Sequence, residues 1–264
     1  MRNLELENYI ANRFVRQENI SDDEIFILTW QNWLETLSPC EIINECICSK
    51  RPVKFISSDD ISVKIYDSFA GKIPVITFSN ASDFESFITN LLYNGERPEN
   101  ISQMGASFIS GKMQRFLALT KKFYSNIEPA YVGLTPGDWR EKSMIIRREH
   151  ELTHYYTKKF YGSASNNLHD ELIADFIGIY AAFEKYSAKL FCHFMGVDGS
   201  HEGRFSLYTE GLSDSTKLEL AKIACQCANF LEGWSNSRNF SQLNTSSRIN
   251  YLCELGINGI LNLL

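Results

Sequence analysis

The N-terminal part of the chain has hydrophobic residues three or four positions apart with polar residues between them, which is the pattern of amphipathic helices. It predicts one helix within residues 4 to 17, where Leu6, Tyr9, Ile10 and Phe14 are the apolar positions. A capping box from Ser21 to Glu24 predicts the start of a second helix, which runs through Leu34. Pro39, just after Ser38, predicts the first position of a third.

The spacing of hydrophobic residues then changes from three or four to two, which is typical of strands. Short strands are predicted at residues 53–56, 61–66 and 73–78, and a hairpin of two further strands at 106–109 and 115–120. A helix capped at Ser82 and ended by Gly95 separates the two groups. These segments predict a small sheet.

The remainder of the chain is predicted to be almost wholly helical. Asp138, with Glu141 three residues later, predicts the cap of a long helix that reaches about Phe160, and Gly162 follows it. Further helices are predicted at about 167–187, 188–195, 214–233 and 246–263. We therefore expect an α+β fold in one domain, 1–264, with an α/β lobe (1–162), a helical lobe (163–264) and a cleft between them.

Within the long helix, residues 150–154 read His-Glu-Leu-Thr-His. Because residues four apart lie one turn above each other, His150 and His154 can reach one metal ion from the same face of a helix. Glu151 cannot comfortably share that coordination, but it can reach a water molecule on the metal, so we expect it to be the general base. A pentapeptide of this kind also arises by chance. The prediction of a metal site therefore needs a third ligand from elsewhere in the chain.

The following predicted helix offers that ligand. Catalytic zinc sites have three protein ligands and an open position, and Glu171 would complete such a set. Asp175 lies four residues later on the same face, where its carboxylate could accept a hydrogen bond from the outer nitrogen of a ligand histidine. The residues between the two helices, Gly162 and 163–167, are expected to form the turn.

His-Glu-Leu-Thr-His followed on the next helix by Glu-x-x-x-Asp resembles the gluzincins, the thermolysin-like zinc metallopeptidases. The resemblance covers only residues 139–187, and it implies a zincin-like fold, Zn²⁺ as the cofactor and a peptide bond as the substrate. It assigns His150, His154 and Glu171 as ligands, Glu151 as base, and Asp175 as the residue behind the ligands. The small intracellular metallopeptidases that cleave phage-type repressors carry a similar Glu-x-x-Ala arrangement, and they remain open as a second group.

The resemblance does not assign the residue that stabilises the transition state. Gluzincins place a Tyr or His beyond the third ligand. His201, Arg204 and Tyr208, which lie in or just after a polar stretch, are the candidates. His169 is a weaker candidate for a residue behind the ligands, since capping or exposure explains it more simply. Residues 104–108, with their small side chains, are a candidate edge strand for an extended substrate.

The composition of the chain limits the kinds of molecule that the protein is expected to bind. A net charge of −6 and a pI near 5.5 argue against nucleic-acid binding. The first residues form no apolar signal segment, and no stretch approaches the roughly 18 apolar residues of a membrane span. Seven cysteines, an odd number, are expected to be reduced. We therefore expect a cytoplasmic protein that acts on a peptide or protein; the sequence leaves its oligomeric state open.

Three other functions remain open at this stage. The same residues could hydrolyse a non-peptide amide or ester, because the chemistry depends on the carbonyl group. The protein could be a toxin or defence protease that acts on one host protein. It could also be a binding module that retains a metal without catalysis, although an intact Glu151 argues against a purely structural site.

Overall fold

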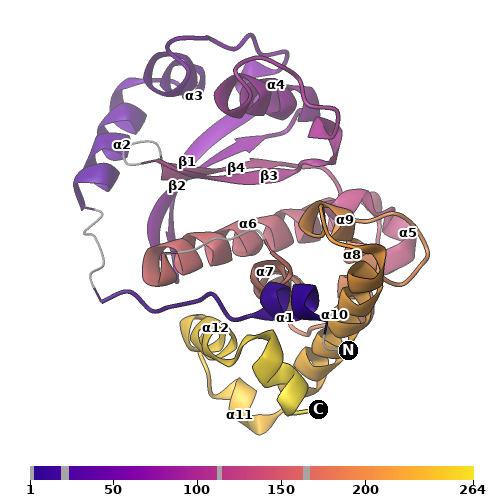
Figure 1. The fold of residues 1–264 in the computed structure, drawn as a ribbon. Helices are drawn as coiled ribbons and strands as arrows, with labels where there is room; N and C mark the ends of the chain where they lie inside the picture. Colours follow the sequence, from indigo (N-terminus) through magenta and orange to yellow (C-terminus); the bar gives the residue numbers. More distant parts are fainter. Residues whose placement is uncertain (1–2, 19–23, 112–114, 163–166) are drawn as a thin grey trace. The chain divides into compact units, whose positions relative to one another are not determined.

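The computed structural model describes residues 3–18, 24–111, 115–162 and 167–264 and shows an α+β fold (Figure 1), so the predicted class is confirmed. The helices are α1 (Leu4–Ile10), α2 (Glu24–Thr36), α3 (Pro39–Glu41), α4 (Ala81–Leu92), α5 (Pro129–Val132), α6 (Pro136–Tyr161), α7 (Leu168–Phe183), α8 (Ala188–Met195), α9 (Phe205–Tyr208), α10 (Asp214–Ser235), α11 (Arg238–Ser241) and α12 (Thr245–Asn262). A π-helix, η1 (Ile42–Ile47), and the 3-10 turns η2 (Ser58–Asp60), η3 (Ile101–Gln103) and η4 (Tyr124–Asn126) accompany them. The strands are β1 (Ile61–Ser68), β2 (Gly71–Phe78), β3 (Ala106–Ser110) and β4 (Arg115–Thr120).

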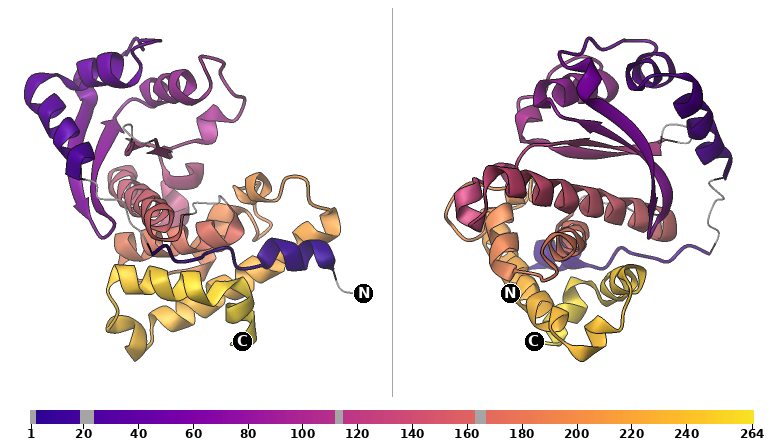
Figure 2. Two further views of the ribbon diagram at one scale, coloured as in Figure 1. Left: turned by 60° about the vertical axis from the view of Figure 1, so that its left-hand side comes forward. Right: turned by 180° about the vertical axis from the view of Figure 1, so that it is seen from behind.

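The chain forms two compact units. The sheet unit is Ser21–Leu152, and the helical unit joins Met1–Ile20 to Thr153–Leu264. Helix α6 is continuous through the boundary, as the view from behind shows (Figure 2). The sequence placed a lobe boundary ten residues later, at the end of this helix, and assigned the N-terminal segment to the α/β lobe.

The sheet unit contains a mixed four-stranded sheet in the order β1-β2-β4-β3. Strands β1 and β2 are antiparallel, β2 and β4 are parallel, and β3 and β4 are antiparallel with Ala106 opposite Leu119. The predicted strands at 61–66 and 73–78 and the predicted pairing of the last two strands are confirmed. Strand β3 lies at one edge of the sheet, as expected for residues 104–108.

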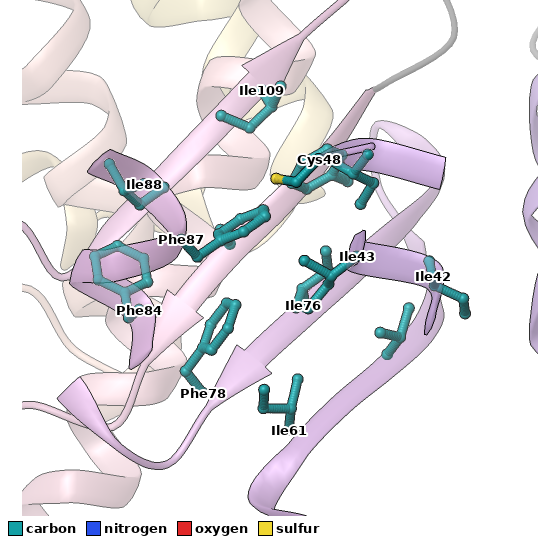
Figure 3. Close-up of a cluster of buried hydrophobic side chains, with 14 of the residues drawn as sticks. Ile42, Ile43, Cys48, Ile61, Ile76, Phe78, Phe84, Phe87, Ile88 and Ile109 are labelled. Carbon is teal, nitrogen blue, oxygen red and sulfur yellow. The ribbon is translucent and has the colours of Figure 1, made fainter. Parts of the chain in front are cut away.

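Helices α2, α3 and α4 pack against this sheet and bury its main hydrophobic core. Figure 3 shows Phe84 and Phe87 of α4 beside Phe78 of β2, and the ring centroids of Phe78 and Phe87 are 5.2 Å apart. Trp30 of α2 is fully buried and contacts Phe116 of β4. Aromatic side chains bury large apolar areas, so together with the isoleucines and valines of this core they stabilise the unit.

The predicted strand at residues 53–56 is wrong. Its backbone groups bond to side chains and do not join the sheet: the amide of Val53 donates to Asn44 Oδ1 at 2.7 Å, and the amide of Ile56 donates to Asp83 Oδ1 at 2.7 Å. Alternating hydrophobic residues favour an extended backbone, but they do not determine which partner takes its hydrogen bonds.

The helical unit packs α7 against α12, α10 and α8, and packs α1 against α10 and α12. The helix predicted within residues 4–17 ends at Ile10. Beyond it, the Asn12 side chain donates to the Cys253 carbonyl at 2.8 Å, inside α12. This contact with a distant segment outweighs the helical pattern. Among the helices that the structure describes, none has the length and apolar character needed to cross a bilayer.

The long helix α6 begins two residues before the predicted cap. Pro136 is its first residue, and Thr135 Oγ1 accepts the amide of Asp138 at 3.2 Å, so Thr135 performs the capping that the sequence assigned to Asp138. The Thr135 hydroxyl in turn donates to Asp138 Oδ2 at 2.7 Å. The capping box predicted for the second helix includes residues 21–23, and the turn predicted before α7 includes 163–166; both lie outside the described residues.

Candidate metal centre

Three predicted ligands come together in the structure. His150 and His154 lie one turn apart on α6, and Glu171 lies in the first turn of α7. One ligand atom from each of the three residues lies within 4.8 Å of the other two, and their exposed fractions are only 6%, 8% and 1%. A buried group of two imidazoles and a carboxylate at this spacing could hold a metal ion.

His150 is oriented by a tyrosine that the sequence analysis missed. Tyr124 Oη lies 3.1 Å from His150 Nδ1, and the buried Tyr124 is fixed through its amide, which donates to Ser143 Oγ at 2.9 Å. A partner at Nδ1 sets the tautomer and the direction of the ring, and it directs Nε2 to serve as the ligand atom. No motif marks Tyr124, because it lies 26 residues before His150.

His154 has an aspartate in the same role. Its Nδ1 lies 3.1 Å from Asp170 Oδ2, and its Nε2 lies 3.4 Å from Glu171 Oε1. Ligand atoms about 2.0 to 2.1 Å from one tetrahedral zinc ion are about 3.4 Å apart, so the second distance suits a shared ion. The sequence analysis assigned the role behind the ligands to Asp175, but the structure places Asp170, directly before Glu171, at this imidazole.

These carboxylates determine the charge of the imidazole. Burial by itself would lower the pKa of His154, but Asp170 and Glu171 raise it well above its ordinary value. Without a metal the ring therefore carries a proton that offsets the charge of two buried carboxylates. A bound cation would replace that proton and fulfil the same electrostatic role.

The far oxygen of Glu171 is held by residues from the polar segment after α8. Tyr208 donates its hydroxyl to Glu171 Oε2 at 2.8 Å, and Arg204 Nη1 lies 3.6 Å from the same oxygen. Burial, together with the charge of Glu171, raises the pKa of Tyr208 well above its ordinary value, so the phenol stays protonated and remains a donor. Glu171 thus keeps Oε1 towards His154.

Arg204 also pairs with Asp175, with Nη2 to Oδ2 at 2.5 Å. Asp175 thereby contributes to fixing the arginine beside Glu171. Its predicted bond to a ligand histidine remains a prediction, as does the role of Arg204 and Tyr208 as transition-state stabilisers. Both candidates do lie at the third ligand.

The remaining candidates lie as follows. Glu151 is 9% exposed and follows His150 on α6, about 100° around the helix axis. His201 groups with His193 and Asp198. His169 is buried, with Nε2 3.1 Å from the Leu252 carbonyl and its ring against Phe14. Neither the capping nor the exposure expected for His169 is present; the cap of α7 is Asn167.

Removal of the Tyr124 hydroxyl is expected to weaken metal binding. Tyr124→Phe keeps the buried ring but loses the bond to His150 Nδ1, and loss of such partners typically weakens metal binding by about 10- to 100-fold. Titration of the metal-free protein with Zn²⁺ against a competing chelator measures the change. Tyr93→Phe, at a tyrosine of the same unit that is 37% exposed, is the control and should bind as the unmodified protein does. Equal affinities for the two variants would remove Tyr124 from the site.

Comparison with known proteins identifies the family to which the chain belongs. No curated protein and no solved structure matches the chain. Residues 42–114 and 112–263 match the family described as a family of unknown function, DUF7005. The matched segments contain every residue of the candidate metal centre, and they cover most of the chain. The protein therefore belongs to the DUF7005 family.

Proposed function

We propose that this protein is a zinc-dependent hydrolase, and specifically a metallopeptidase. One observation carries the proposal: both histidines of the His-Glu-x-x-His motif have Nδ1 against a second residue, Tyr124 or Asp170, while Glu171 Oε1 lies beside His154 Nε2. A histidine buried for packing alone needs no such arrangement. Two oriented imidazoles and a carboxylate fit the catalytic type of zinc site.

When bound, zinc would lower the pKa of a water molecule to about 7 and polarise the substrate carbonyl. The protein's own residues supply the rest of the reaction. Glu151 takes the proton of that water as general base and passes it to the leaving nitrogen. Arg204 and Tyr208 are donors beside Glu171, and we propose that one of them stabilises the oxyanion of the transition state.

The sheet unit also offers a place for an extended substrate. Arg147, three residues before His150 on α6, donates to the carbonyls of Thr120, the last residue of β4, and Phe123, which follows the strand. Its guanidinium lies so close to Gly105 that a Cβ there would be 2.4 Å from Arg147 Nε. The start of edge strand β3 therefore lies against the helix that carries the motif, and we propose that β3 pairs with the peptide substrate.

The ladder of β3 shows which of its amides face away from β4. The Thr120 amide donates to the Gly105 carbonyl at 3.0 Å, so Gly105 and Thr120 form a hydrogen-bonded antiparallel pair. Since such pairs alternate along the strand, the amide of Ala106 points away from β4. It is the donor that an added strand would use.

Ala106→Pro removes this donor and should raise KM for peptide substrates about 10-fold, which is the order expected for loss of one buried hydrogen bond of about 1 to 1.5 kcal/mol. Metal content should not change. Ala106→Val, which keeps the amide, is the control. Kinetics with a cleaved peptide decide the matter: an unchanged KM in the proline variant, with its fold intact, would show that substrates bind elsewhere.

The proposed activity itself is tested with a peptide library. The purified protein, stripped of metal and then loaded with Zn²⁺, is expected to cleave library peptides that the stripped protein leaves intact, and a chelator should stop the cleavage. Parallel assays with ester and non-peptide amide substrates distinguish the alternatives. Cleavage of these alone would overturn the peptidase assignment and retain the hydrolase. Stoichiometric zinc without any hydrolysis would favour a binding module.

A further inference from the structure

A second group of metal-binding side chains lies in the helical unit. It consists of His193, in the last turn of α8, with Asp198 and His201 of the segment that follows. One ligand atom from each lies within 4.8 Å of the other two. The imidazole rings of His193 and His201 have centroids 4.3 Å apart. None of these residues belongs to the motif or to the centre described above.

The backbone is folded to bring these three residues together. Helix α8 ends at Met195 and is capped by Gly196 in the left-handed conformation, with φ of +75°, and the chain returns to the same point at Gly203. A Cβ on Gly196 would lie 2.2 Å from Gly203 N, and one on Gly203 would lie 2.4 Å from Gly196 N. Only a pair of glycines permits this approach, so residues 197–202 form a closed loop above the end of α8.

The side chains inside the loop are connected to one another. Asp198 Oδ2 lies 2.8 Å from His193 Nδ1, and the Ser200 hydroxyl donates to Asp198 Oδ1 at 2.7 Å. The amide of Ser200 also donates to Asp198 Oδ1, at 3.1 Å. A carboxylate beside two imidazoles is a ligand set that suits zinc.

His201 supplies an independent observation. Its Nδ1 lies 3.1 Å from Ser200 Oγ, while its Nε2 is buried and has no hydrogen-bond partner among the described residues. A buried nitrogen without a partner costs free energy comparable to a lost hydrogen bond. A ligand at this nitrogen would recover that cost.

We propose that His193, Asp198 and His201 bind a second transition-metal ion of the zinc type, separate from the ion at His150, His154 and Glu171. The ion fixes the loop that leads into Arg204. Arg204 lies three residues after His201, and its guanidinium reaches both Glu171 and Asp175. Its role is to hold the loop on α8, since His193 belongs to the helix while Asp198 and His201 belong to the loop.

The ion count in variants tests this second site. Zn²⁺ titration against a competing chelator should give two equivalents in the unmodified protein and one in His154→Ala, which isolates the second site. His154→Ala combined with His201→Ala should bind none. His154→Ala combined with His169→Gln is the matched control and should keep one equivalent. Zn²⁺ should also raise the melting temperature of His154→Ala and leave that of the His154→Ala/His201→Ala variant unchanged.

A nearby thiol pair must be distinguished from the proposed ligands. Cys192 Sγ and Cys225 Sγ lie 3.3 Å apart, and Cys192 directly precedes His193. Co²⁺ bound to His154→Ala should lack the thiolate charge-transfer absorption that cysteine ligands produce, and Cys192→Ser with Cys225→Ser should keep the second equivalent. A single equivalent in the unmodified protein, unchanged binding after His201→Ala, or thiolate absorption would each overturn the second site. None of these results would contradict the proposed ion at His150, His154 and Glu171.

Discussion

Glu151→Gln should retain its zinc and lose most of its peptidase activity, with kcat lowered by about 10²- to 10⁴-fold, the usual contribution of a general base. The amide of glutamine preserves the shape of this buried side chain but cannot accept a proton from water. Peptide cleavage and metal content, measured on the same preparation, separate the two effects.

The control for this experiment is on the same helix. Glu149 lies two residues earlier on α6, where it accepts Arg148 Nε at 2.8 Å, and Glu149→Gln makes the same chemical change outside the motif. It should leave kcat within a few-fold of the original value. Full activity in Glu151→Gln would exclude Glu151 as the base, whereas loss of zinc from Glu151→Gln would show that it acts on metal binding.

His154→Ala should abolish binding at the first centre and with it all zinc-dependent cleavage. This substitution removes the ligand that lies 3.4 Å from Glu171 Oε1 and leaves Asp170 and Glu171 buried without the imidazole between them. Such buried carboxylates repel each other, so the melting temperature should fall as well. Calorimetric titration with Zn²⁺ measures the lost equivalent, and thermal unfolding measures the lost stability.

His169→Gln is the matched control, because His169 is equally buried in the same unit but bonds to the Leu252 carbonyl. It should keep the zinc affinity of the first centre. If His154→Ala bound zinc at that centre as tightly as His169→Gln, the ligand assignment would be wrong.

Family membership extends these predictions to other proteins. The match to DUF7005 spans the two helices of the candidate metal centre, α6 and α7, and the loop of the second proposed ion. Demonstrated zinc-dependent cleavage by this chain would therefore provide a functional hypothesis to test on other members that share His150, Glu151, His154 and Glu171.

Local sequence was sufficient where the chemistry depends on spacing along one helix. The separation of His150 and His154 by four residues places them on one face of any regular helix, and the Glu171 position on the next helix could be deduced from the need for a third ligand. Strands β1 and β2 were predictable from alternation, and α8 from its periodicity, because each is a regular element with a buried face.

Contacts between distant segments were decided only by the tertiary structure. Tyr124 reaches His150 from η4, and Tyr208 reaches Glu171 from 37 residues away, so neither could be recognised from spacing. The choice of Asp170 over Asp175 at His154 depends on how α7 is rotated against α6. Two carboxylates near one ligand look equivalent in a sequence, and packing determines which of them faces the imidazole.

The amino-acid sequence by itself thus determined the fold class, the long motif helix and which three side chains, His150, His154 and Glu171, form a group that could hold a metal ion, since these depend on local periodicity and on residue chemistry. The tertiary structure decided which side chains orient the ligands, why the segment at 53–56 is not a strand and where His201 lies. Those outcomes depend on partners that are far away in the chain, and hydrogen bonds and packing select such partners only once the chain has folded.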